Sequence, residues 1–368
     1  MLGKRDKKGQ PTVYDRLFRY GEFLGFGELH IKIDKNLDLR AIVAIHNTAR
    51  GPAIGGCRCI QYDTSEAALE DVLRLAQLMS YKAAVHNLPH GGAKAVIIAP
   101  PVIRDRKAFF EAFGDFVHTF NGKYITAEDS GTTTQDMDVI ATRTPYVLGT
   151  SKASGGHGDP SLLTAVGVWR GIEAAVKFKL NRSLEGIHVA MQGIGHVGYP
   201  LAKRLYNAGA KLTVCDINKV ATEQAAREFK ATVVDTEAIY GVNCDVFAPC
   251  ALGGIINLKN VNQLKTKIVA GAANNQLAHH HHGQLLFEHG ILYAPDFVIN
   301  GGGLIHVASI YKGENPETCE EQIYNIYDTL MDIFQQAEEE NRPTNIIAEK
   351  IAEKNMGIEQ IEVGAGAL

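Results

Sequence analysis

The chain has 368 residues, of which 45% are apolar and 21% charged, and its net charge is −4. These values are ordinary for a globular protein of about two domains, and the charge balance excludes a basic nucleic-acid or membrane binder. No stretch approaches the roughly 20 apolar residues of a membrane helix. The charged N-terminus has no apolar segment behind it, so we expect no signal peptide, and the scattered cysteines indicate a reduced, cytoplasmic protein.

The first region, residues 1–150, is predicted to mix helices with hairpin strands. Residues 30–48 indicate two strands joined at a polar turn. Residues 65–85 carry apolar side chains at helical spacing, with Ser65 as the expected N-cap, so Lys82 falls near the end of a long helix. Residues 106–120 predict a second helix, and residues 123–126 a strand after it.

The Gly- and Ser-rich residues 151–160 indicate a hinge or domain boundary. Beyond it strands alternate with helices, which favours a parallel sheet with helices on both faces. The predicted strands lie in residues 186–192, 211–216, 231–235, 244–249, 267–274 and 292–300. Residues 320–340 predict one long helix, ended by Pro343. We therefore expect a two-domain α/β protein with domains at 1–150 and 151–334, and residues 335–368 packing back on the first domain.

A glycine-rich motif follows the first strand of the second region. It comprises Gly193, Ile194, Gly195, His196, Val197 and Gly198. The motif alone is weak, but a strand precedes it, an amphipathic helix follows, and the next strand ends in Asp216, 18 residues after Gly198. This context is typical of a dinucleotide site, in which Asp216 would bond the ribose hydroxyls and repel a 2′-phosphate, favouring NAD over NADP. The alternative is a turn whose glycines serve packing only.

Two lysines and an aspartate fall beside glycine pairs. The pairs are Gly55–Gly56, placed after a strand, and Gly91–Gly92, placed before one; glycine lets a ligand reach backbone N–H groups, or marks a turn. Lys82, Lys94 and Asp129 lie near these breaks. Singly, each lysine is typical of a solvated surface. Together, in the domain that precedes a nucleotide site, the three indicate acid–base chemistry.

Eight segments in order carry a resemblance to a known family. They are "GPAIGGCR", "YKAAVHNLPHGGAKAVI", "AEDSGTT", "GDPSLLTAVGVWRG", "QGIGHVGYPLAKRL", "FAPCALGG", "AGAANNQLA" and "YAPDFVINGGGLIHVA". This set resembles the amino-acid dehydrogenases that act on leucine, valine, phenylalanine and glutamate, and the leucine branch most. The resemblance implies a substrate-binding and oligomerisation domain followed by a Rossmann-type NAD domain, an active site in the cleft between them, and a homo-oligomer.

The resemblance also implies roles for single residues. Lys82 would bind the α-carboxylate, Lys94 would be the catalytic lysine, and Asp129 would handle the proton of the amino group. Gly55 and Gly56 would meet the carboxylate through backbone N–H groups. The cofactor would be bordered by Thr164, at the nicotinamide amide, and by Cys250, Ala251, Leu252, Asn274 and Asn275, with the contacting asparagine undecided. Asn300 would lie near the substrate.

The chemistry explains these residue types. Oxidation leaves an iminium that water must attack, and a lysine serves as general base only if burial or a second cation lowers its pKa, for which Lys82 near Lys94 is the expected source. Glutamate dehydrogenases have a lysine where this chain has Ile54. The side-chain carboxylate of glutamate would therefore be buried without a partner here, which disfavours glutamate as the substrate. The expected pocket is apolar and is lined by Ile54, Ala127, Leu304 and Val307. Leu304 is bulkier than the usual valine, which favours valine or 2-aminobutyrate over phenylalanine as the substrate.

The sequence thus predicts NAD-dependent, reversible oxidative deamination of L-leucine, L-valine and L-isoleucine to 2-oxo acids and ammonia. The alternatives are a phenylalanine or other aromatic amino-acid dehydrogenase and a non-catalytic NAD-binding sensor. A 2-hydroxy-acid dehydrogenase is disfavoured because no histidine–carboxylate pair with an arginine is evident. His279–His282 are expected in a solvated loop, with no metal site predicted. His157 and the tail after residue 361 depart from the family pattern, which leaves hinge motion and oligomer size open.

Overall fold

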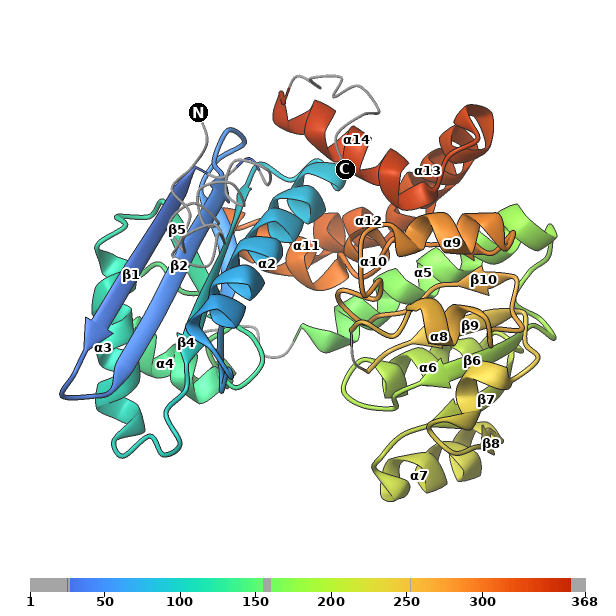
Figure 1. Ribbon diagram of the computed structural model, residues 1–368, viewed down its shortest axis with the longest axis horizontal. Coiled ribbons are helices and arrows are strands. Elements are labelled where there is room, and N and C mark those ends of the chain that lie inside the picture. Colours follow the sequence, from blue (N-terminus) through green and yellow to red (C-terminus); the bar gives the residue numbers. More distant parts are fainter. Residues whose placement is uncertain (1–24, 26, 155–159, 252, 359–368) are drawn as a thin grey trace, which may run out of the picture. The chain divides into compact units, whose positions relative to one another are not determined.

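The computed structural model describes residues 25, 27–154, 160–251 and 253–358, and His157 and Leu252 lie outside them. The chain divides into two compact units (Figure 1). The first comprises Met1–Ala84 with Pro89–Gly158, and the second comprises Val85–Leu88 with Asp159–Leu368. In the described ranges no helix is both long and apolar enough to cross a membrane.

The first unit is built on a five-stranded mixed sheet in the order β1-β2-β4-β3-β5. The strands are β1 (Glu28–Asp34), β2 (Leu39–Asn47), β3 (Ala53–Ile60), β4 (Gly91–Ile98) and β5 (Tyr124–Glu128). The antiparallel pair β1–β2 confirms the predicted hairpin, and β3 runs parallel to both β4 and β5. The carboxyl ends of these parallel strands therefore meet at one edge, where loop residues of the unit converge.

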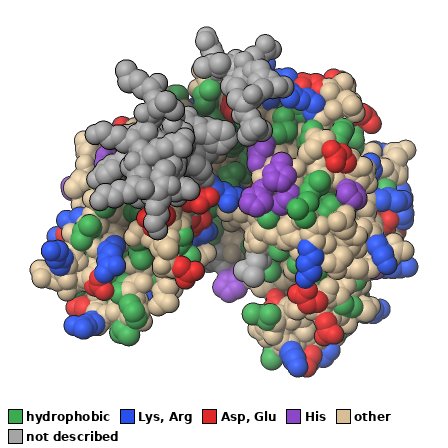
Figure 2. All heavy atoms as spheres, in the orientation of Figure 1, with side chains coloured by type: hydrophobic (Ala, Val, Ile, Leu, Met, Phe, Trp, Pro, Cys, Tyr) green, Lys and Arg blue, Asp and Glu red, His purple; other side chains and the backbone are tan. Residues whose placement is uncertain are grey.

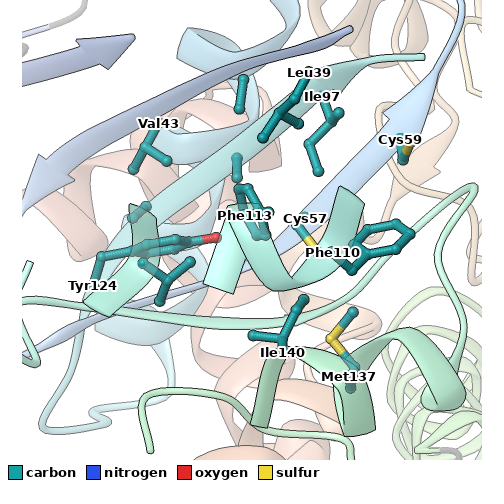
Figure 3. Close-up of a cluster of buried hydrophobic side chains, with 14 of the residues drawn as sticks. Leu39, Val43, Cys57, Cys59, Ile97, Phe110, Phe113, Tyr124, Met137 and Ile140 are labelled. Atoms are coloured by element: carbon teal, nitrogen blue, oxygen red, sulfur yellow. The ribbon is translucent and has the colours of Figure 1, made fainter. Parts of the chain in front are cut away.

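Helices cover both faces of this sheet because its strands alternate apolar residues on each side. Helix α2 (Ser65–Val85) packs on the face that holds Ile42, Ala44 and Val96. Helices α3 (Arg106–His118) and α4 (Thr134–Ala141) pack on the other face, against the cluster shown in Figure 3. That cluster is rich in aromatic side chains, including Phe109, Phe110, Phe113 and Tyr124.

The start of α2 differs from the prediction by one residue. Ser65 is the first helical residue rather than the cap. The preceding Thr64 accepts a hydrogen bond from the Ala67 N–H through its Oγ1, at 3.1 Å, which is the N-cap interaction. Both Thr64 and Ser65 are good cap residues, and their order along the chain does not decide between them.

The two glycine pairs belong to strands rather than flanking them as predicted, since Gly55–Gly56 lie inside β3 and Gly91–Gly92 are the first residues of β4. Gly91 and Gly92 open β4, where a Cβ on Gly91 would lie 1.8 Å from the Asn47 carbonyl oxygen. A Cβ on Gly92 would lie 2.0 Å from the Ser80 backbone nitrogen in α2. The pair therefore lets β2 and α2 approach the backbone of β4 more closely than any side chain allows.

The second unit has a six-stranded, wholly parallel sheet, as predicted. Its strands are β6 (His188–Gln192), β7 (Lys211–Cys215), β8 (Thr232–Val233), β9 (Val246–Pro249), β10 (Ile268–Val269) and β11 (Leu292–Tyr293). The order β8-β7-β6-β9-β10-β11 is that of the doubly wound dinucleotide-binding fold. In such sheets ligands bind beyond the carboxyl ends of the central strands, where the order reverses between β6 and β9.

Several helices complete the second unit. They are α5 (Ser161–Leu180), α6 (Gly198–Asn207), α7 (Lys219–Phe229), α8 (Leu258–Val261), α9 (His282–Glu288), α10 (Asp296–Ile299), α11 (Gly302–Lys312), α12 (Pro316–Tyr324), α13 (Ile326–Glu340) and α14 (Thr344–Met356), with a 3-10 turn at η2 (Ala238–Gly241). The other 3-10 turn, η1 (Lys152–Ser154), belongs to the first unit. The predicted long helix at 320–340 is two helices, since α12 ends and α13 begins at Asn325, a poor helix former.

The C-terminal helices belong to the second unit. Thr344, at the start of α14, donates through its Oγ1 to the Tyr293 carbonyl in β11, at 2.6 Å. This contact and those of α14 with α13 lie within the second unit. The sequence led us to expect residues 335–368 on the first domain, and of these 359–368 lie outside the described residues.

Candidate active site

The first unit brings Lys94 and Asp129 into direct contact. Lys94 lies in β4 and Asp129 just after β5, and the Lys94 Nζ donates to the Asp129 Oδ2. In the register of β3 with β4, Ile54 is opposite Gly92, so Gly56, two residues further along β3, is opposite Lys94. On the other side of β3, Gly56 is opposite Ala127 in β5. Because alternate residues of a strand share a face, Lys94 and Asp129 both project on the α2 side of the sheet. Gly56, between them, has no side chain to separate the two.

Asp129 is held as an anion by its surroundings. Its Oδ1 accepts from Arg58 Nε at 3.0 Å and from the Ser130 N–H at 2.6 Å. Burial raises the pKa of the Asp129 carboxyl, but the cationic Lys94 and Arg58 outweigh burial and hold that pKa well below its ordinary value. The Lys94 side chain is 6% exposed and that of Asp129 16%, so the pair is shielded from water.

Three further residues, to which no sequence motif assigned a role, form hydrogen bonds next to this pair. Arg58 Nη1 donates to Asp71 Oδ2 at 2.8 Å, and the Tyr62 hydroxyl donates to the same oxygen at 2.5 Å. Arg58 lies two residues after Gly56 in β3, so the alternation that places Gly56 beside Lys94 also places Arg58 on that face. The spacing of Arg58 from Gly56 could have predicted its place on this face. Nothing in the sequence pattern of α2 distinguishes Asp71 from the other polar residues of that helix.

The other substrate residues predicted in the first unit lie in β3, β5 and α2. A Cβ on Gly56 would lie 2.6 Å from the Glu128 carbonyl oxygen, and one on Gly55 would lie 1.7 Å from the Ala93 carbonyl oxygen. Ile54 is fully buried, and Ala127 is half-buried at the end of β5. Lys82 lies in the last turn of α2 and is half-buried.

The second unit forms the glycine-rich turn between β6 and α6. Gly193 has a φ of +102°, a conformation that glycine adopts without strain, and a Cβ there would also press on Ala251 at 2.8 Å. A Cβ on Gly198 would lie 2.2 Å from the Gly193 carbonyl oxygen, whereas one on Gly195 would meet nothing within 4 Å. The open space at Gly195 fits the approach of a pyrophosphate to the backbone.

Asp216 follows β7 and faces this turn. Its Oδ2 accepts from the Ile194 N–H at 2.7 Å, and its Oδ1 accepts from the Asn218 N–H at 2.8 Å. Each carboxylate oxygen keeps a lone pair after one such bond. The carboxylate is therefore fixed in place and still able to accept from the hydroxyls of a ribose. His196 is exposed and Val197 half-buried. Within the motif, Gly198 packs closely on the Gly193 backbone and Ile194 makes the hydrogen bond to Asp216.

Of the remaining predicted cofactor residues that the structure describes, Cys250 and Ala251 follow the end of β9 and Thr164 lies in α5. The Cys250 N–H, after β9, donates to the Gln192 carbonyl at 2.7 Å, and burial raises the pKa of the Cys250 thiol to about 12. Thr164, in the first turn of α5, lies against α11, since a Cβ on Gly303 would sit 2.7 Å from its Oγ1. Ala251, the residue after Cys250, borders Gly193.

Asn300 and Asn274 form a hydrogen-bonded pair. Asn300 Nδ2 donates to the Asn274 Oδ1 at 2.8 Å and to the Ala272 carbonyl at 3.1 Å. Asn300 is 5% exposed, and its Oδ1 has no hydrogen-bond partner within the described residues. A buried acceptor without a partner fits an amide or ammonium donor of a ligand. The backbone of the neighbouring Asn275 is in the left-handed region, with φ +51°. Leu304 is buried and Val307 half-buried, both in α11.

The four-histidine run lies elsewhere in the second unit. Figure 2 shows histidine side chains gathered on its surface, and the rings of His279, His281 and His282 contact one another. His280 Nε2 lies 2.8 Å from a Glu349 oxygen in α14, and this hydrogen bond raises the pKa of His280. Among the residues placed by the structure, no group of three or more His, Cys, Asp or Glu is arranged to hold a metal ion.

Comparison with known proteins identifies the family. Residues 27–146 match the dimerisation domain of the Glu/Leu/Phe/Val dehydrogenases, and residues 213–352 match the Glutamate/Leucine/Phenylalanine/Valine dehydrogenase family. The leucine dehydrogenase of Geobacillus stearothermophilus is 49% identical, over 92% of this chain and 93% of its own length. That of Thermoactinomyces intermedius is 48% identical, over 93% of each chain.

Relatives with other named substrates are also similar. The L-tryptophan dehydrogenase of Nostoc punctiforme is 44% identical over 92% of this chain and 95% of its own. The crystal structure of L-tryptophan dehydrogenase from that organism superposes with a TM-score of 0.80, covering 92% of this chain and 98% of that one. The two-unit architecture, the strand order and the sequence motifs therefore all agree with the family matches. The chain belongs to the Glu/Leu/Phe/Val dehydrogenase family and is a nicotinamide-dependent amino-acid dehydrogenase that acts on the CH–NH2 group.

Proposed function

We propose that this protein catalyses the NAD-dependent, reversible oxidative deamination of branched-chain L-amino acids, with L-leucine, L-valine and L-isoleucine as substrates. The observation that carries the proposal is the shielded Lys94–Asp129 pair, in which a lysine within β4 contacts an aspartate just after β5. A cation and an anion shielded from water suit a reaction that moves protons at an amino nitrogen and an attacking water. The identity to leucine dehydrogenases supports the substrate class.

The proposal gives each residue of the first unit one task. Lys82 anchors the substrate α-carboxylate as a fixed ammonium. Lys94 acts as general base toward the water that adds to the iminium carbon, and in the reverse direction donates to the carbonyl oxygen. Asp129 stays ionised, since its pKa is held low, and accepts from the substrate amino group. In the second unit, Asn300 Oδ1 supplies a buried acceptor beside Asn274.

The proposed cofactor is NAD, held at the glycine-rich turn, at Asp216 and near Thr164 and Cys250. Bound there, NAD would supply the acceptor for the hydride that leaves the substrate Cα. We further propose that the protein works as a homo-oligomer, because the first unit matches a dimerisation domain.

The choice of NAD over NADP depends on Asp216. In Asp216→Asn the amide oxygen still accepts from the Ile194 N–H, but the charge that repels a 2′-phosphate is gone. A hydrogen bond to a charged group is worth about 1.5–3 kcal/mol, so the ratio of kcat/KM for NADP over NAD should rise roughly tenfold to 100-fold. Steady-state kinetics with both cofactors measure this ratio, and an unchanged ratio would show that Asp216 does not meet the ribose.

Side-chain selectivity is expected to depend on Leu304 in α11. Removing one methylene in Leu304→Val widens the proposed pocket, and a methylene is worth about 1–3 kcal/mol of discrimination. The ratio of kcat/KM for L-leucine over L-valine should rise about tenfold. The matched control is Ile305→Val, also buried in α11, which should lower thermal stability without changing the ratio. Equal shifts in both variants would contradict a pocket at Leu304.

The whole proposal is tested by NADH formation with a panel of L-amino acids. The panel holds L-leucine, L-valine, L-isoleucine, L-phenylalanine, L-tryptophan and L-glutamate, with 2-oxo acid plus ammonia for the reverse reaction. Preferred turnover of the branched-chain acids is expected. Preferred turnover of L-phenylalanine or L-tryptophan would overturn the proposed branched-chain substrate class but leave the proposed oxidative deamination in place. Binding of NAD with no turnover of any amino acid would overturn the proposal.

A further inference from the structure

A chain of hydrogen bonds extends from Asp129 away from Lys94. Arg58 is its centre, donating from Nε to Asp129 Oδ1 at 3.0 Å and from Nη1 to Asp71 Oδ2 at 2.8 Å. The Tyr62 hydroxyl closes the chain on Asp71 at 2.5 Å. One guanidinium therefore bridges two carboxylates that belong to different elements, α2 and the loop after β5.

This network is shielded from water. The side chain of Arg58 is 17% exposed, that of Asp71 24% and that of Asp129 16%. Two cations, Lys94 and Arg58, face two anions, Asp129 and Asp71, so the formal charges balance. Removal of one partner leaves an uncompensated charge in a partly dry site, which is unfavourable. The four charges are therefore expected to act as a unit.

The geometry of the guanidinium decides the orientation of Asp129. With Oδ1 occupied by Arg58 and by the Ser130 N–H, the other oxygen is the one directed at Lys94. A planar guanidinium offers diverging donors in a fixed fork, whereas a lysine ammonium is a point charge on a flexible stem. Lysine at position 58 cannot serve Asp71 and Asp129 with the same geometry.

We propose that Arg58, held by Asp71 and Tyr62, is a positioning residue that fixes the Asp129 carboxylate in the orientation in which one oxygen meets Lys94. The inference rests on the proposed function, in which Lys94 and Asp129 are the reacting pair, and adds the residues that hold the pair. Asp71 acts through Arg58, and Tyr62 acts through Asp71. None of these three residues needs to touch the substrate.

The network also sets the ionisation of Asp129. The cations that contact Asp129 are Lys94 from β4 and Arg58 from β3, and two buried groups interact with it electrostatically. These are the Cys57 thiol, whose pKa burial raises to about 12, and the Tyr124 hydroxyl, whose pKa burial also raises, so both stay neutral. Asp71 and Tyr62 face Arg58, and burial raises the pKa of Tyr62 above its ordinary value, which keeps its hydroxyl a donor to Asp71. Loss of the Arg58 contact removes one of the two cations that lower the pKa of Asp129. That pKa then rises, and activity that needs the anion is lost at a higher pH on the acid side.

The test compares Arg58→Lys, Asp71→Asn and Tyr62→Phe with the wild type. We expect kcat to fall about 10- to 100-fold in Arg58→Lys and Asp71→Asn, with KM for NAD unchanged, and severalfold in Tyr62→Phe. The acid limb of the kcat/KM profile should move to higher pH in Arg58→Lys. The control is Arg106→Lys, which weakens a similar pair with Asp136 in the same unit, at 2.7 Å, and should lower stability without moving the limb.

A second readout does not depend on activity. Trace labelling with acetic anhydride, followed by mass spectrometry, reports how readily the Lys94 amine reacts. Labelling of Lys94 should increase severalfold in Arg58→Lys and Asp71→Asn relative to Arg106→Lys, because Asp129 no longer holds the amine in place. If the wild type turns over no amino acid but the labelling changes as expected, the network stands and the proposed function fails. If the wild type is active but neither the limb nor the labelling moves, the positioning role is overturned.

Discussion

Lys94→Ala should abolish amino-acid oxidation almost completely while leaving NAD binding intact. A positioned acid–base group contributes about 10²- to 10⁴-fold, so kcat/KM for L-leucine should fall by roughly that factor. Lys94 belongs to the first unit and the nucleotide turn to the second, so the substitution leaves the cofactor contacts untouched. Stopped assays of NADH formation measure the loss, and quenching of protein fluorescence by NADH measures binding.

Removal of Lys94 also leaves Asp129 with Arg58 as its remaining cationic partner, so part of the loss could reflect a disturbed fold. Small amines such as methylamine separate the two causes, because they can occupy the space vacated by the side chain. A partial rescue that grows with amine concentration would assign the loss to the missing amine. Lys123→Ala, which removes a surface partner of Glu28, is the control and should retain full activity. Activity within tenfold of wild type in Lys94→Ala would contradict the assignment.

The sequence pattern was sufficient for the hairpin of the first sheet and for the parallel sheet of the second unit, because strand alternation and the rhythm of strand and helix are local properties. The hairpin of β1 and β2 and the six parallel strands follow from such patterns. The position of Gly91–Gly92 within β4 did not, because it depends on the backbone of Ser80 and Asn47, which approach from other elements. Spacing along one chain does not reveal which backbones come close.

The same reason explains what was missed around the proposed reacting pair. Lys94 and Asp129 were identified from their motifs, and strand register then placed them together. Asp71 lies on a helix whose pattern is explained by burial of its apolar face, so nothing in the pattern distinguishes it from other polar helix residues. Its significance comes from the contact with Arg58, which only the packing of α2 on the sheet creates.

The glycine-rich turn gives a prediction that separates binding from folding. A Cβ on Gly195 meets nothing within 4 Å, so Gly195→Ala should leave thermal stability unchanged. The same methyl would occupy the space in which we expect the pyrophosphate, so KM for NAD should rise at least tenfold, equivalent to about 1.4 kcal/mol. Gly241→Ala, where a Cβ also meets nothing, is the matched control outside the turn and should change neither quantity.

Gly198→Ala should behave differently because its methyl would lie 2.2 Å from the Gly193 carbonyl oxygen, which is backbone and cannot rotate away. The turn must open to relieve this overlap, and overpacking of this kind costs about 1–3 kcal/mol. Both thermal stability and NAD binding should therefore fall. Calorimetry and NAD titration of the three variants give the pattern. If Gly195→Ala bound NAD as tightly as wild type while Gly198→Ala lost stability alone, the glycines would serve packing and the cofactor would have to bind elsewhere.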